Sequence, residues 1–242
     1  MVRDLDGQVA LVTGAGSGLG AAIATALAAD GAHVVVADLV LEKADACVAL
    51  IREATHSAEA CSLDVGSAGE AAALVERVLA LRGRLDVLVN NAAVDFTVPA
   101  DELAIAEWER AIRTNLSGPY FTARAVIPAM KRAGHGHIVN ICSTASRRAW
   151  PNAAPYHASK WGLLGLSHAL HAELRPAGIK VTAVLAGGMR TPFLLDRFPD
   201  IDVACLQDPA NVAEVVRWSL KLPAESVMPE VMVLPMRETS WP

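Results

Sequence analysis

The feature that most constrains the fold of this chain is a short apolar run that leads through a glycine-rich turn into an alanine-rich stretch. Val9-Ala10-Leu11-Val12 has the length of a strand, residues 13–20 read Thr-Gly-Ala-Gly-Ser-Gly-Leu-Gly, and residues 21–29 favour a helix. Glycines let the backbone approach a pyrophosphate, which the free N–H groups at a helix start can bind. A turn without a ligand is the alternative, which the flanking strand and helix disfavour. The predicted dinucleotide contacts in this unit are Thr13, Gly14, Ser17, Gly18, Leu19 and Gly20.

A carboxylate ends the next predicted strand. Asp38 follows Val34-Val35-Val36-Ala37 and stands 20 residues after Gly18, where a carboxylate can accept hydrogen bonds from both ribose hydroxyls of an adenosine. The same charge repels a 2′-phosphate, and the first Lys or Arg after the glycine turn is Lys43. Asp38 as a plain strand-end cap is the alternative. The missing basic residues favour NAD as the cofactor over NADP.

Ser143, Tyr156 and Lys160 form a candidate catalytic set. Tyr156 and Lys160 are four residues apart, so a helix places them on one face. A phenol with a pKa near ~10 is a weak base at neutral pH, and an adjacent ammonium favours the phenolate and lowers that pKa. The Ser143 hydroxyl, at the end of an apolar run, can hydrogen-bond a substrate oxygen while Tyr156 transfers the proton. On its own the Y-x-x-x-K pattern is common and is weak evidence for a catalytic site. The glycine turn earlier in the chain strengthens that interpretation.

With these motifs in this order, the chain resembles the short-chain dehydrogenase/reductase family in its single-domain form, over nearly its whole length. The resemblance implies that Asn115 anchors a water for proton relay and that Ser143, Tyr156 and Lys160 are catalytic. It also implies further contacts to the cofactor, including the Tyr156 and Lys160 side chains. Those further contacts are Leu39, Asp64, Val65, Asn91, Ala92, Gly187, Met189 and Thr191.

Three places depart from the family pattern. Ala93 stands where glycine is usual and Ala186 where proline is usual, both expected beside the nicotinamide. Ala93 restricts the backbone and Ala186 loosens a turn, yet neither removes a reacting group, so we expect a retuned pocket in an active enzyme. The Asp-Gly-Gly that often follows the last strand is absent, which leaves the placement of residues 236–242 open.

Strands and helices alternate along the chain, which predicts a Rossmann-like, doubly wound parallel sheet of about seven strands with helices on both faces. We expect one domain over residues 1–242, with ligands at the carboxyl ends of the strands. The predicted strands are 8–13, 33–38, 59–63, 85–90, 136–142, 179–185 and 231–234. The predicted helices are 19–30, 41–55, 67–82, 102–132 with a break, 155–175 and 209–221.

Composition limits the classes of protein to which this chain can belong. A net charge of −5 argues against a nucleic-acid surface, and 53% hydrophobic residues suffice for one sizeable core. No apolar run is long enough to span a bilayer and the start of the chain lacks a signal core, so a cytoplasmic protein without a membrane partner is expected. The four cysteines are scattered and read as free thiols. No metal is expected, because His168 and His171, with Glu173, lack a third ligand of suitable kind.

The sequence favours an NAD-dependent oxidoreductase acting on a secondary alcohol or its ketone. An NADP-dependent carbonyl reductase and a non-catalytic dinucleotide-binding regulator remain alternatives, the second because a fold alone does not establish activity.

Residues 192–207 are expected to form a substrate lid, and one guanidinium of Arg147-Arg148 could reach a substrate anion. The substrate contacts expected are Phe96, Ser143, Trp150, Tyr156, Met189 and Phe193, with Val94, Asp95, Thr144, Leu194 and Phe198 as further pocket residues. Apolar residues on several sides of 102–132 and 155–175 predict a homotetramer.

Overall fold

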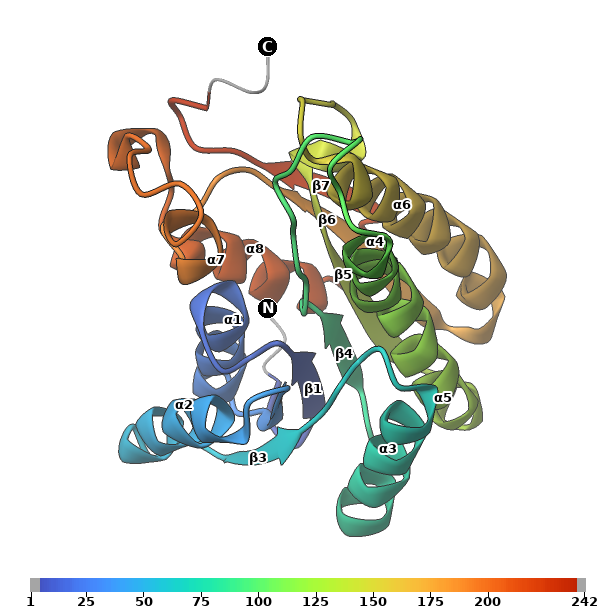
Figure 1. Cartoon of the computed structure of the whole chain (residues 1–242). Helices are drawn as coiled ribbons and strands as arrows, with labels where there is room; N and C mark the ends of the chain where they lie inside the picture. The colour runs from blue at the N-terminus through green and yellow to red at the C-terminus, as the bar shows by residue number, and fades with distance from the viewer. Residues whose placement is uncertain (1–4, 239–242) are drawn as a thin grey trace.

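In residues 5–238, which the computed structural model describes, seven parallel strands form one sheet (Figure 1). The strands are β1 (Val9–Thr13), β2 (His33–Asp38), β3 (Ala58–Ser62), β4 (Val87–Asn90), β5 (Gly136–Ser143), β6 (Ile179–Ala186) and β7 (Glu230–Val233). Their order across the sheet is β3-β2-β1-β4-β5-β6-β7. The chain therefore winds outward from β1 in one direction, returns, and winds outward from β4 in the other, which leaves a crevice above β1 and β4.

Helices cover both faces of the sheet (Figure 1). The helices are α1 (Gly18–Ala29), α2 (Leu41–Glu53), α3 (Ala68–Arg82), α4 (Ile105–Ile112), α5 (Gly118–Ala133), α6 (Ala154–Leu174), α7 (Pro192–Leu195) and α8 (Pro209–Leu220). One face carries α1, α2 and α8, and the other carries α3, α5 and α6. The predicted Rossmann-like doubly wound fold is confirmed.

Alternate residues of each central strand pack into different halves of the core. Val12 of β1 packs in a buried cluster with Ile23 of α1 and Val216 of α8. Its neighbour Leu11 belongs to the opposite cluster, with Val126 of α5. Because both faces are buried, the strands read as continuous apolar runs without alternation, which is why their positions could be predicted.

The predicted long helix 102–132 does break, and the break has a specific form. α4 ends at Ile112, a π-helical turn follows over Arg113–Ser117, and α5 begins at Gly118. Such turns change the direction of side chains locally and occur often at functional sites. Here the turn contains the fully buried Asn115.

The region after β6 differs most from expectation. The short helix α7 was not predicted, and it lies within the segment expected to be a lid. Of the C-terminal tail, Met236–Glu238 follows β7, and the carboxylate of Glu238 accepts a hydrogen bond from the Gly188 N–H at 3.1 Å. Residues 239–242 lie outside the described part of the chain. Within the described part, no helix combines the length and apolar character needed to cross a bilayer.

Candidate active site

A cavity of about 820 Å³ lies at the carboxyl ends of the strands and brings most of the predicted site residues together. Its size is that of a small-molecule or cofactor site. From the predicted set, it is lined by Gly14, Ser17, Gly18, Leu19, Asp38, Leu39, Asp64, Val65, Asn91, Ala92, Ser143, Trp150, Tyr156, Lys160, Gly187, Met189, Thr191 and Phe193. Thr13, Gly20, Asn115 and Phe96 do not line it.

Two glycines of the turn that leads from β1 into α1 stand where a side chain would not fit. Gly14 has φ +61°, and a Cβ added there would lie 2.7 Å from the Cα of Ala92. A Cβ on Gly20 would lie 2.2 Å from the carbonyl oxygen of Gly14. These glycines are therefore required by the backbone itself, and they bring the start of the 12-residue helix α1 to the cavity.

Thr13 and Asn91 hold the turn after β1 against the turn after β4. The Thr13 hydroxyl accepts hydrogen bonds from the backbone N–H groups of Asn91 and Ala92, at 3.1 and 3.2 Å. The Asn91 amide donates to the carbonyl oxygens of Thr13 and Gly14, both at 2.9 Å. Thr13 is buried away from the cavity. In this structure each of these two side chains shapes the crevice by binding backbone groups of the opposite turn.

Asp38, at the end of β2, is fixed beside the glycine turn. Its Oδ2 accepts a hydrogen bond from the Gly16 N–H at 2.9 Å, and its Oδ1 accepts one from the Val40 N–H at 3.0 Å. Gly16 was not among the predicted site residues, although it lies inside the predicted turn. The first basic residue, Lys43, packs close by, since a Cβ on Gly16 would lie 2.6 Å from the Cβ of Lys43. Lys43 does not line the cavity.

Tyr156 and Lys160 lie on one face of α6, as their spacing predicts, and Ser143 faces them from the end of β5. The Ser143 side chain is close enough to the Tyr156 phenol to act on its pKa, in the downward direction. The Lys160 Nζ lies 5.7 Å from the centre of the Tyr156 ring and donates to the Ile141 carbonyl oxygen at 2.7 Å. A hydroxyl, a phenol and an ammonium thus converge on one wall of the cavity.

Burial dominates the acid–base properties of this wall. It raises the pKa of Tyr156 to about 12, against the lowering effects of the Ser143 hydrogen bond and the Arg197 charge. Burial also lowers the pKa of Lys160 to about 8. The sequence predicted that Lys160 would bring the pKa of Tyr156 down. In this structure the net change is upward, because removing the phenolate from water costs more than the nearby charges return.

Asn115 uses its side chain to hold the loop after β4. Its Oδ1 accepts from the Val94 N–H at 2.8 Å, and its Nδ2 donates to the Val94 carbonyl oxygen at 2.7 Å. The second Nδ2 hydrogen has the Ser159 hydroxyl as its acceptor at 3.1 Å. Both amide hydrogens are therefore used within the protein, so this side chain positions the loop that carries Val94 into the cavity.

His157, which the sequence analysis did not single out, holds the loop that carries Trp150. Its Nε2 lies 3.1 Å from the donating Trp150 N–H, and its Nδ1 lies 3.2 Å from the Ala145 carbonyl oxygen. The Trp150 ring meets the imidazole edge-on, with centroids 4.3 Å apart. Its position directly after Tyr156 is the sequence feature that could have marked His157 as a residue of the site.

The structure also shows where other polar residues considered in the sequence lie. One guanidinium of Arg147-Arg148 was expected to reach a substrate anion, but neither residue lines the cavity, and the Arg147 guanidinium pairs with Glu230 at 2.7 Å. His168 also contacts Glu230, at 3.0 Å. Among the described residues, no three His, Cys, Asp or Glu side chains are grouped to hold a metal ion.

An ion pair crosses the substrate side of the cavity. The Asp95 carboxylate, in the loop after β4, pairs with the guanidinium of Arg197, in the predicted lid. Both residues line the cavity, and Asp95 was among the expected pocket residues. Phe96 was expected there as well, but its ring lies beneath the Arg110 guanidinium, 6.0 Å away, and not at the cavity. Arg197 was missed because nothing nearby in sequence indicates its partner.

Known proteins resemble this chain in both sequence and structure. Residues 8–202 match the family model described as short chain dehydrogenase. D-threitol dehydrogenase of Mycolicibacterium smegmatis is 42% identical over 182 residues, which are 74% of this chain and 69% of the relative. Trans-4-hydroxycyclohexanecarboxylate dehydrogenase of Sinomonas cyclohexanicum is 38% identical over 191 residues, 76% of this chain and 73% of the relative.

A solved structure extends the similarity to the whole fold. The crystal structure of a metagenomic short-chain oxidoreductase in complex with NADP has a TM-score of 0.85 at 38% identity, and covers 97% of this chain and 99% of that one. The fold and the matching relatives define a nucleotide-binding oxidoreductase. This chain belongs to the short-chain dehydrogenase/reductase family.

Proposed function

We propose that this protein transfers a hydride reversibly between NAD and a secondary alcohol or its ketone. The observation that carries the proposal is the shared wall of Ser143, Tyr156 and Lys160 in a cavity whose other end contains the glycine turn and Asp38. A regulator that only binds a dinucleotide has no physical need for the first three residues in one place.

The nucleotide end of the cavity suits a dinucleotide. The backbone N–H groups at the start of α1 can bind a pyrophosphate, because the crowded turn of Gly14 and Gly20 brings the helix end close. Asp38 stands where the adenosine ribose of such a ligand lies in this fold. When bound, the nicotinamide supplies the acceptor or donor of the hydride. Met189, Thr191, Ala93 and Ala186 also line the cavity, and Thr191 lies close to Gly18 of the glycine turn.

The protonation states of Tyr156 define the two directions. With a pKa of about 12, the Tyr156 phenol keeps its proton at neutral pH and can donate it to the oxygen of a ketone being reduced. Oxidation of an alcohol needs the phenolate, which the charge of Arg197 favours. The Lys160 ammonium, 5.7 Å from the centre of the ring, is proposed to stabilise it as well. Ser143 is placed to hydrogen-bond the same substrate oxygen. Asn115 acts indirectly through the Val94 loop. Both of its amide hydrogens are already donated within the protein, so a relay water near Asn115 would need hydrogen-bond partners other than that NH2 group.

NAD is the proposed cofactor because of Asp38, and NADP is the second candidate. The fixed Asp38 carboxylate presents negative charge where a 2′-phosphate would sit. The NADP complex of the similar metagenomic oxidoreductase and the closeness of Lys43 to the glycine turn favour the second candidate. Direct titration with both reduced cofactors separates them, since tighter binding of NADPH contradicts the NAD assignment.

We further propose that the protein is a homotetramer. Large side chains lie exposed on the helices predicted to form its interfaces: Trp108, Tyr120 and Trp161 are 39%, 45% and 52% exposed. A two-fold axis would let this apolar surface cover itself.

A screen of secondary alcohols and ketones, followed by NADH absorbance, tests the proposed reaction. Tyr156→Phe should lower kcat/KM by at least about 10²-fold on any accepted substrate, because it removes the transferred proton. Tyr120→Phe is the matched control, since Tyr120 is the other tyrosine and lies on the surface. Near-full turnover by Tyr156→Phe would contradict the mechanism.

A further inference from the structure

The Asp95 carboxylate has one oxygen engaged and one without a partner. Its side chain is 7% exposed, and its Oδ2 receives the guanidinium of Arg197. Its Oδ1 is buried and has no hydrogen-bond partner among the described residues. Buried carboxylate oxygens are nearly always hydrogen-bonded, so a lone one inside a cavity calls for a donor from elsewhere.

Arg197 is held in the orientation that leaves Oδ1 unpaired. Its Nε donates to the Phe193 carbonyl oxygen at 2.8 Å, and its guanidinium carbon lies 4.2 Å from the centre of the Phe193 ring. Phe198 adds a second ring at 5.6 Å. The guanidinium is thus tied to its own segment and meets only one oxygen of Asp95.

Asp95 stands beside the reacting groups. It lines the same cavity as Ser143 and Tyr156, and its charge raises the pKa of both Tyr156 and Lys160. The Tyr156 and Phe193 rings lie 6.1 Å apart, so the aromatic support of Arg197 borders the catalytic wall. A small molecule whose reacting oxygen meets Tyr156 therefore extends toward Asp95.

The charge of this pair favours a neutral donor. Arg197 already compensates the Asp95 carboxylate, so a cationic substrate group gains little there, and a carboxylate on the substrate would meet the charge of Asp95. A hydroxyl can donate to Oδ1 at no cost in charge. A simple alcohol would instead leave the oxygen unpaired, and sites built around a hydrogen bond reject analogues that lack it.

We propose that Asp95 determines substrate specificity by accepting a hydrogen bond from a second hydroxyl of the substrate, which is therefore a diol or longer polyol. The proposal rests on the proposed function, since the first hydroxyl is the one that Tyr156 deprotonates.

Matched pairs of substrates test the proposal with the wild-type protein. We would compare 2-butanol with 2,3-butanediol and cyclohexanol with trans-1,2-cyclohexanediol, supplying NAD and NADP separately and including each stereoisomer. The expected result is a kcat/KM at least about tenfold higher for the preferred diol than for its matched alcohol. Equal or better use of the simple alcohols overturns the proposal and leaves the proposed function intact. Turnover of no compound in either series overturns both.

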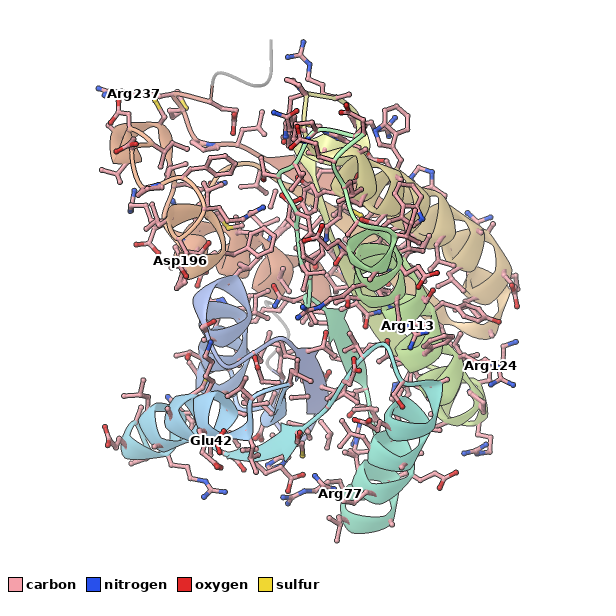
Figure 2. The ribbon with its side chains drawn as sticks, in the orientation of Figure 1. Glu42, Arg77, Arg113, Arg124, Asp196 and Arg237 are labelled. Atoms are coloured by element: carbon pink, nitrogen blue, oxygen red, sulfur yellow. The ribbon has the colours of Figure 1, made fainter. Side chains whose placement is uncertain are left out.

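Variants then separate recognition from a structural role. Asp95→Leu with Arg197→Met removes the pair as a unit, because replacing both partners by apolar residues is tolerated better than removing one. The expected result is a fall of at least about tenfold in the ratio of diol to alcohol kcat/KM. If Asp95 and Arg197 had only a structural role, the double variant would lower kcat/KM for the diol and for the alcohol by the same factor. An unchanged ratio of the two would therefore overturn the proposal. Asp196→Ala, at the exposed neighbour of Arg197 labelled in Figure 2, should keep the wild-type ratio.

Discussion

Replacing Lys160 with methionine should stabilise the protein at neutral pH while removing its proposed activity. Lys160 is 2% exposed, and burial lowers the pKa of its ammonium from 10.5 to about 8. Each pKa unit corresponds to about 1.4 kcal/mol, so keeping this lysine charged at neutral pH costs on the order of 3 kcal/mol. Methionine keeps the packing but loses the hydrogen bond from the charged ammonium to Ile141, which is worth about 1.5–3 kcal/mol. The expected net gain is at most about 1.5 kcal/mol, or a rise in Tm of up to roughly 6 °C.

Thermal unfolding followed by circular dichroism across pH checks both the size and the origin of the gain. The pKa of Lys160 is lower in the folded state than in the unfolded state, so below about 8 the lysine is protonated in both and its cost is constant. As the pH rises from about 8 toward 10.5, the folded state loses this proton first and the wild type recovers stability. The advantage of Lys160→Met should therefore shrink over that range.

Lys221 provides the matched control. Its side chain is also largely buried, at 9% exposed, but its ammonium lies 2.5 Å from the Asp30 carboxylate. Lys221→Met should destabilise the protein, because it leaves that carboxylate buried with a weaker partner. The reasoning about Lys160 is refuted if Lys160→Met is no more stable than the wild type at neutral pH, or if its advantage does not change between pH 8 and 10.

Other outcomes are expected on the same grounds. The rate of alcohol oxidation should rise with pH through the alkaline range, because Tyr156 must lose a proton whose pKa burial raises; a flat profile would contradict this. Gly20→Ala should abolish cofactor binding or folding because its Cβ meets backbone 2.2 Å away, whereas Gly69→Ala, with its nearest atom at 4.0 Å, should be tolerated. Asp38→Ala with Leu39→Arg should shift binding toward NADP in a cofactor titration. Light scattering should give about four times the mass of one chain, and a value near 25.4 kDa would exclude the oligomer.

The strands could be placed from sequence to within two residues because the central ones, such as β1, β4 and β6, are buried apolar runs closed by a polar residue or glycine. The edge strands β3 and β7 are only partly buried. The break in helix 102–132 was expected, but its form was not, since the π-helical turn depends on Asn115 reaching Val94 across 21 residues. The four-residue helix α7 is too short to leave a periodic pattern.

Some features of the candidate site could likewise be predicted from the sequence, and others could not. The glycine turn and Asp38 are local motifs, so their positions could be read from the chain. The direction of the pKa change of Tyr156 depends on burial, which spacing does not reveal. The pairing of Asp95 with Arg197 joins residues 102 positions apart, and the loop containing Phe96 has no periodicity to fix which way each side chain points.

Because of the hydrogen bonds between Thr13 and Asn91, the turns on the nucleotide side of the crevice lose their conformational freedom when the chain folds, before any ligand binds. These hydrogen bonds join turns that are 78 residues apart, so folding itself orders the nucleotide side of the crevice. A dinucleotide would then bind without the entropic cost of ordering those turns. The substrate side is built on the four-residue helix α7, which contains Phe193, and on Phe198; these two phenylalanines are 39% and 38% exposed. Substitutions there can change which molecule is accepted while leaving nucleotide affinity intact, so the two halves of this cavity are free to diverge at different rates.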